Sequence, residues 1–89
     1  MECRIQTTRE GNRRLVLVAG RLSIQELPDF LGACAHAAGE QLVIDLSDLV
    51  SIDEETSRHV VRLAAEGARL QAVSPYIQMV LGFTTGTRP

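Results

Sequence analysis

The stretch QLVIDLSDLVSID, residues 41–53, decides the fold of this chain. Its first half, residues 41–46, is a mostly apolar run and predicts a strand in the middle of a sheet. Asp53 is a residue type that caps helices, and apolar positions at helical spacing follow it until Gly67. A buried strand that leads into an amphipathic helix over 53–66 indicates an α/β fold.

Two further strands precede this unit. Residues 2–8 alternate between polar and apolar side chains, which predicts a half-buried edge strand. A turn signal at residues 9–12 separates it from residues 15–19, LVLVA, a second central strand that Gly20 is expected to end. The two strands are close enough in sequence to form an antiparallel hairpin.

A first helix is predicted over residues 24–38, and Gly39 is expected to stop it. Ser23 and Glu26 have the spacing of a capping box. Pro28 conflicts with a regular helix, so either the first turn is distorted or the regular helix begins at Pro28. The positions expected to face the core are Ile24, Leu27, Phe30, Leu31, Cys34 and Ala38.

The C-terminal part adds a strand over 68–73 and a helix over 75–81, with Pro75 at its first position. Ile77, Val80 and Leu81 should face inward. The order is then ββαβαβα, which predicts a four-stranded mixed sheet with three helices, the last three strands being parallel. Residues 1–82 form one domain in this interpretation, and residues 83–89, FTTGTRP, form a flexible tail.

The composition of the chain narrows the range of functions that it can have. The chain has 89 residues, enough for one domain, and 45% of them are hydrophobic. Residues 1–21 carry five Arg against two Glu, and residues 22–89 carry four Arg against nine acids, a contrast that we interpret as solvated faces. Three aromatic residues could hardly build a stacking platform for nucleic acid. With two cysteines and no long apolar run, we expect a cytoplasmic protein with reduced thiols and no membrane insertion.

No arrangement of side chains specifies an enzyme. Cys34 and His36, like Ser57 and His59, are two residues apart on helices and do not share a face. A cluster of carboxylates could hold a metal, but helix capping and the helix dipole explain it better. We therefore expect no catalytic residue, no metal and no cofactor. The carboxylates of this cluster are Asp45, Asp48, Asp53, Glu54 and Glu55.

Residues 42–53, LVIDLSDLVSID, closely resemble the central strand and following loop of STAS domains, the family of bacterial anti-sigma factor antagonists. Residues 18–22 resemble the strand-to-helix junction of those domains. Residues 67–70 resemble the start of their last strand, and residues 74–81 their final helix. The resemblance covers residues 13–82 and implies the same ββαβαβα fold.

In regulated STAS domains, a Ser after this Asp is phosphorylated by a partner anti-sigma factor that is also a kinase. Here Asp53 matches the pattern, but Glu54 occupies the phosphoserine position and Thr56 the following Gly position. The resemblance therefore implies a protein-binding regulatory module that is not switched at the usual Ser. Thr56 and Ser57 are the nearest substitute acceptors, and we expect both to point partly toward the sheet.

The resemblance also implies where a partner binds: the start of the second helix, with Asp53, Glu54, Glu55, Arg58 and Arg62. Helical spacing places Glu54, Arg58, Arg62 and Glu66 on one stripe, opposite Val60, Val61 and Ala64. The partner is another protein, either an anti-sigma factor kinase, an ABC ATPase if the chain is an accessory subunit of a lipid-transport system, or a second copy. No nucleic acid is expected. A small unrecognised enzyme is the alternative from another class.

Overall fold

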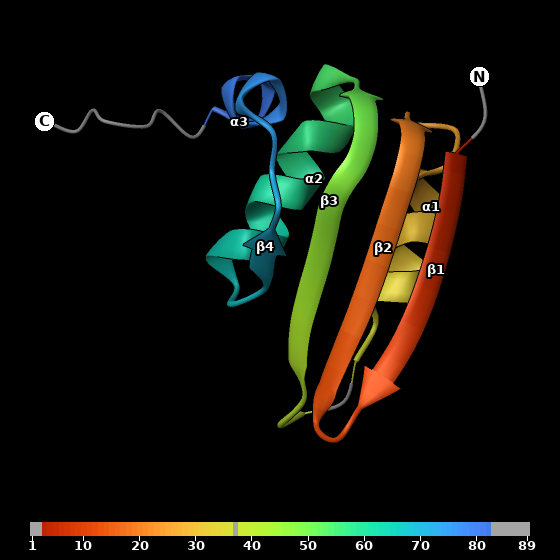
Figure 1. The fold of residues 1–89 in the computed structure, drawn as a ribbon, viewed down its shortest axis with the longest axis vertical. Coiled ribbons are helices and arrows are strands. Elements are labelled where there is room, and N and C mark those ends of the chain that lie inside the picture. Colours follow the sequence, from red (N-terminus) through yellow and green to blue (C-terminus); the bar gives the residue numbers. More distant parts are fainter. Residues whose placement is uncertain (1–2, 37, 83–89) are drawn as a thin grey trace, which may run out of the picture.

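The computed structural model describes residues 3–36 and 38–82 and confirms the predicted ββαβαβα order. Figure 1 shows the elements. No helix in this part of the chain is long and apolar enough to cross a membrane. The elements are β1 (Cys3–Glu10), β2 (Arg13–Leu22), α1 (Leu27–Cys34), β3 (Gln41–Ile52), α2 (Glu54–Ala65), β4 (Arg69–Gln71) and α3 (Pro75–Leu81).

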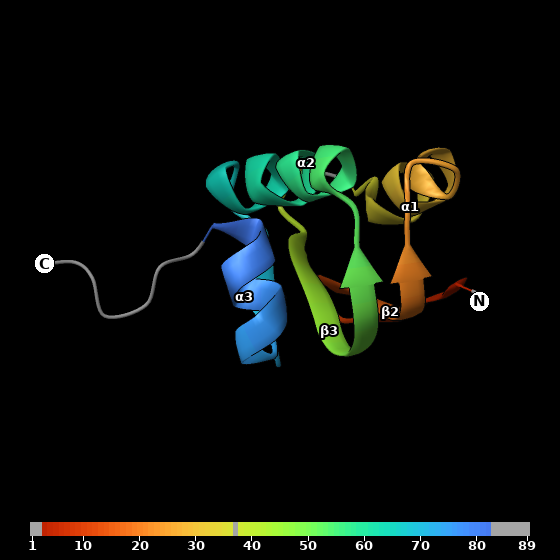
Figure 2. The ribbon, with the colours of Figure 1, turned by 90° about the horizontal axis from the view of Figure 1, so that it is seen from above.

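The sheet has the order β1-β2-β3-β4, with β1 at an edge as predicted. β1 pairs antiparallel with β2 through a hairpin whose Gly11 has a φ of 59°, while β2, β3 and β4 are mutually parallel. Helices α1 and α2 lie on one face of the sheet, and α3 lies beside β3 (Figure 2). Parallel strands joined by helices on one face require the right-handed crossovers that the element order predicts.

The core lies between the sheet and the helices. Val16 and Val18 of β2 and Leu42, Ile44 and Leu46 of β3 are at most 2% exposed. The helices add buried apolar side chains to the same cluster, namely Leu27, Phe30, Cys34, Val60, Ile77 and Leu81. Because burial of apolar area dominates folding free energy, these residues hold the helices to the sheet.

Strands β2 and β3 are longer than the sequence predicts. β3 continues from the expected end at residue 46 to Ile52, and β2 continues past Gly20, which was expected to end it, to Leu22. The extra pairing passes through two register shifts, and Gly20 has a φ of 90° beside one of them. A glycine adopts this backbone conformation without steric cost, so Gly20 kinks β2 instead of ending it.

Helix α1 is shorter than the predicted range 24–38. It runs from Leu27 to Cys34 with Pro28 in its first turn, so the alternative in which the regular helix starts near Pro28 is correct. The Glu26 N–H donates to the Ser23 carbonyl oxygen at 3.0 Å, which makes residues 23–26 a turn and not a capped helix start. Half of the expected capping box forms, because the Glu26 carboxylate accepts from the Ser23 N–H at 3.1 Å. It closes this turn and does not cap α1, whose start has no side-chain cap.

Because α1 begins later than predicted, its buried face includes only some of the residues expected there. Leu27, Phe30 and Cys34 are buried, whereas Ile24 and Leu31, both expected in the core, are 43% and 38% exposed. Gly39 does not end the helix, because α1 stops at Cys34. The apolar period must be counted from the residue at which the helix begins, and the turn before Leu27 moves Ile24 off the buried face.

The bounds of the remaining elements are close to those predicted from the sequence. α2 and α3 begin and end within a residue of the predicted ranges, and Ser74 caps α3 by accepting from the Ile77 N–H. β4 is shorter than the predicted 68–73, because Ala72 turns the backbone to a φ of 59°. The predicted tail, residues 83–89, lies outside the described residues.

Candidate protein-binding site at the start of α2

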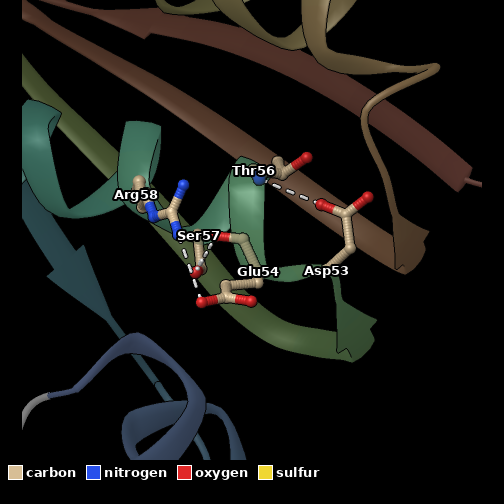
Figure 3. A network of polar contacts seen from close by, with 5 residues as sticks. All are labelled: Asp53, Glu54, Thr56, Ser57 and Arg58. Carbon is tan, nitrogen blue, oxygen red and sulfur yellow. Dashed lines mark hydrogen bonds and ion pairs between the residues drawn. The ribbon is translucent and has the colours of Figure 1, made fainter.

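Asp53 fixes the start of α2, as the sequence predicts. Its Oδ1 accepts a hydrogen bond from the Thr56 N–H at 2.9 Å, and its Oδ2 accepts from the Ile24 N–H at 2.9 Å (Figure 3 shows the first of these). One carboxylate thus caps α2 and ties it to the loop between β2 and α1. The two segments are far apart in sequence, so this bond sets the shape of the surface at this end of the sheet.

The contacts of Asp53 also favour its ionised form. The Thr56 hydroxyl lies outside hydrogen-bonding geometry, but its polarity contributes most to lowering the pKa of Asp53 below its ordinary value. Partial burial opposes this shift, and the N–H groups of Thr56 and Ile24 reinforce it. Asp53 is therefore a fixed negative charge at the positive end of the helix dipole.

Glu54, which the sequence resemblance places at the phosphorylated Ser of STAS domains, projects into solvent. Its side chain is 85% exposed, and its Oε2 lies 3.2 Å from Nη2 of Arg58, which is 70% exposed (Figure 3). An ion pair this open contributes only about 0.3–0.5 kcal/mol to stability. The pair is therefore weak enough to be exchanged for contacts with another molecule.

The two nearby hydroxyls point away from solvent, as predicted. Thr56 is 0% and Ser57 5% exposed. The Ser57 hydroxyl donates to the Glu54 carbonyl oxygen at 2.6 Å, and Thr56 Oγ1 is buried without a hydrogen-bond partner among the described residues. At the start of α2, the surface presents carboxylates and the hydroxyls are covered.

The predicted stripe on α2 is exposed throughout. Glu54, Arg58, Arg62 and Glu66 all face solvent, and Val60, on the other side of the helix, is fully buried. Glu55 is also exposed, and Asp53 is half-buried. The structure thus brings the predicted partner-binding residues onto one accessible surface; that a partner binds there remains a prediction.

Two exposed apolar residues at this end of the sheet escaped the sequence analysis. Ile24 is 43% exposed and its N–H is bonded to Asp53, while Val50 is 57% exposed near the end of β3. Ile24 was expected in the core, and its position before Pro28 is the one local signal that could have excluded it from α1. Apolar side chains beside exposed charges are typical of surfaces that bind proteins.

The cluster of five acidic residues does not form a site. Asp45 lies within β3, where its carboxylate accepts from the Ser47 N–H at 2.9 Å and from Gln71 Nε2 at 3.0 Å. Burial is the largest influence and raises the pKa of Asp45, but these hydrogen bonds together leave it lowered. No group of three metal-ligating side chains occurs within residues 3–36 and 38–82.

Cys34 and His36 form no reactive site either. Cys34 is 3% exposed, and burial raises the pKa of its thiol to about 12, which keeps it protonated. His36 Nδ1 lies 3.0 Å from the Cys34 carbonyl oxygen, which is a backbone contact. Cys34 is therefore a packed core residue.

No known family profile and no curated protein matches the sequence. Solved structures do match. The STAS domain of an antisigma-factor antagonist from Rhodobacter sphaeroides is 22% identical, with a TM-score of 0.57 over 79% of this chain and 86% of that one. Mglu is 24% identical, with a TM-score of 0.61 over 79% of this chain, but this chain covers only 19% of the length of Mglu.

The match to Mglu shows that this arrangement also occurs as a small part of a much longer chain. At identities below 25%, both likenesses concern the fold and leave the function open. They confirm the fold that the resemblance of residues 42–53 predicted. The protein has a STAS-like α/β fold, with a four-stranded mixed sheet and three helices.

Proposed function

We propose that this protein is a binding module of the anti-sigma factor antagonist type that captures another protein with the start of α2 and acts without catalysis. The observation that carries the proposal is the exposed carboxylate of Glu54 at the position where the resemblance places a phosphorylated Ser. Arg58, Arg62 and the apolar Ile24 extend the same surface. Glu54 offers no hydroxyl to a kinase, so the module is not switched by phosphorylation at this position.

The burial of the neighbouring hydroxyls supports the absence of a switch. A kinase that used Thr56 or Ser57 would have to expose a side chain that is at most 5% accessible. It would also break the Asp53 cap or the hydrogen bond from Ser57 to the Glu54 carbonyl oxygen. Each of these bonds contributes on the order of 1 kcal/mol, so the acceptors are protected by the first turn of α2.

Charge reversal on the stripe tests the binding surface. Arg62→Glu and Glu54→Lys should each leave the melting temperature within a few degrees, because both side chains are exposed. At an interface, reversing a charge that faces its complement costs about 2–5 kcal/mol. We expect both variants to lose capture of the partner, measured by pull-down and by calorimetry with candidate anti-sigma factors from the same genome.

Arg4→Glu is the matched control, since Arg4 is an exposed arginine on β1, away from α2. It should bind like the wild type. Wild-type affinity in both α2 variants would refute the proposed surface. Capture of an ABC ATPase in place of an anti-sigma factor would support the accessory-subunit alternative.

The missing switch is tested separately. Mass spectrometry of the protein from its native cells should find no stoichiometric phosphate in residues 53–57. Stoichiometric phosphate on Thr56 or Ser57 would contradict the proposal and restore a phosphorylation switch.

A further inference from the structure

β2 and β3 begin at the end of the sheet opposite the start of α2 (Figure 1). A hollow lies there, lined by residues at the starts of β2, β3 and β4. It has a volume of about 610 Å³, and its lining includes Asn12, Arg13, Gln41, Val43 and Arg69. Val43, only 1% exposed, is its apolar floor. Nothing in the proposed function uses this region.

The strand register places the two arginines around the floor. Arg13 is paired with Gln41 of β3, and Arg69 is paired with Val43, so β3 runs between them. Leu42 and Ile44 belong to the core under the helices, so Gln41 and Val43 face the opposite side of the sheet. Two strand spacings and an offset of two residues place the Cα atoms of Arg13 and Arg69 roughly 12 Å apart. Two long guanidinium side chains can close on one ligand across this span.

The frame of the hollow is held by hydrogen bonds. Gln41 Nε2 donates to the Leu42 carbonyl oxygen at 3.1 Å and to the Gly67 carbonyl oxygen at 3.1 Å. The Gln41 N–H donates to the Asn12 carbonyl oxygen at 2.7 Å. These bonds link the β1–β2 turn, β3 and the loop before β4. The two arginines are thus carried by segments that are fixed to one another.

The charges of the hollow are unbalanced. Arg13 and Arg69 are exposed, and neither guanidinium makes an ion pair or hydrogen bond with another residue in the described part of the chain. Glu10 faces Arg13 across the β1–β2 ladder without an ion pair between them. No acidic side chain is among the described residues that line the hollow. This is a doubly positive site on a protein of net charge −2.

We propose that this hollow binds an oxyanion group, a phosphate or a carboxylate, between Arg13 and Arg69. A planar guanidinium donates paired hydrogen bonds to the oxygens of such groups, and two of them from opposite sides fix its position. Asn12 adds an uncharged polar side chain at the rim. The site is independent of the surface at α2, so it can hold a ligand while α2 holds a partner.

The test is a titration of the isotope-labelled protein with two probes, inorganic phosphate and a short peptide with two adjacent Glu residues. Amide NMR shifts should be confined to the starts of β2, β3 and β4 and should weaken at high salt. Binding of phosphate alone would identify a small-anion site, and binding of the peptide would identify an acidic segment of another protein. Either result supports the site.

Arginine substitutions decide whether the site is specific. Arg13→Gln and Arg69→Gln should each weaken binding about fivefold, and the double variant should abolish it. Arg4→Gln is the matched control, because Arg4 is an exposed arginine near the other end of the hairpin and should bind like the wild type. The proposal is overturned if neither probe shifts these amides at millimolar concentration, or if Arg4→Gln loses as much affinity as Arg13→Gln.

Discussion

Helices α1 and α2 each follow a parallel strand of the same mixed sheet, but they begin in different ways. α2 has a side-chain cap, Asp53, that bonds the Thr56 N–H, and it extends over 12 residues. α1 has no side-chain cap at Glu26 and extends over 8 residues. A helix of this length is not stable by itself in water, so α1 depends on the side chains that it buries. The two helices therefore show local and tertiary control of a helix start in one small domain.

This difference between the two helix starts explains why the proposed binding surface lies on α2 and not on α1. The start of α2 is held by hydrogen bonds from the Thr56 and Ile24 N–H groups to the Asp53 carboxylate. The side chains of Glu54 and Arg58 are not needed for the cap and face solvent. The buried residues of α1, among them Leu27 and Phe30, are used for packing. A surface that must keep its shape while it presents charges is better built on a capped helix.

The largest expected effect comes from the packing of α1. Phe30→Ala should lower the free energy of unfolding by about 3–5 kcal/mol, because Phe30 is fully buried and its removal leaves a cavity. Urea denaturation measures this. Leu31→Ala, a truncation of a 38% exposed side chain on the same helix, should cost less than about 1 kcal/mol. Equal losses would mean that α1 is not held by its buried face.

A smaller effect is expected at the helix starts. Asp53→Ala should cost about 1–2 kcal/mol, since it removes the acceptor for both the Thr56 and the Ile24 N–H. Ser23→Ala should cost less, because Ser23 closes a turn before α1 and caps no N–H of the helix. Unfolding curves of the two variants provide the comparison. A larger loss for Ser23→Ala would show that the capping-box interpretation of residues 23–26 was right.

Removing either hydroxyl from the first turn of α2 should change the free energy of unfolding by less than the removal of the Asp53 cap. Ser57→Ala removes the hydrogen bond to the Glu54 carbonyl oxygen and should cost about 1 kcal/mol. Thr56→Val should stay within about 0.5 kcal/mol of the wild type, because two effects oppose each other. It removes a polar group beside Asp53, which destabilises the fold, and it removes a buried hydroxyl without a partner, which stabilises it. Thermal and urea unfolding of the two variants measure these changes in stability. A loss above 1 kcal/mol for Thr56→Val would reveal a hydrogen bond of that hydroxyl.

The smallest effect concerns pH. The pKa of Asp53 is lowered in the folded protein, first by Thr56, so the unfolded chain binds a proton more readily. The resulting stability is present above the ordinary value of 3.8 and is lost as the pH falls through the folded pKa. Asp53→Asn should therefore lose less stability than the wild type between pH 5 and pH 3, measured by urea denaturation at each pH. An identical pH dependence would exclude this contribution.

Local signals were enough for much of the fold and part of the site. Residues 41–46 form a mostly apolar run, which predicts a central strand, and Asp53 and Ser74 predict the starts of α2 and α3 from residue type alone. The exposure of Glu54 and the burial of Ser57 follow from the period of α2. These features depend on contacts within a few residues, and so they can be derived from the sequence.

Tertiary structure decided the rest. Residues 47–52 of β3 form a strand because β2 pairs with them across a kink at Gly20, although Asp48 and Ser51 interrupt the apolar pattern. Ile24 is exposed because the chain turns before Leu27, and its N–H reaches Asp53, 29 residues away. Arg13 and Arg69 meet around one hollow only because β3 lies between their strands. A period or a cap is a property of neighbouring residues, whereas pairing partners and shared surfaces depend on how distant segments pack.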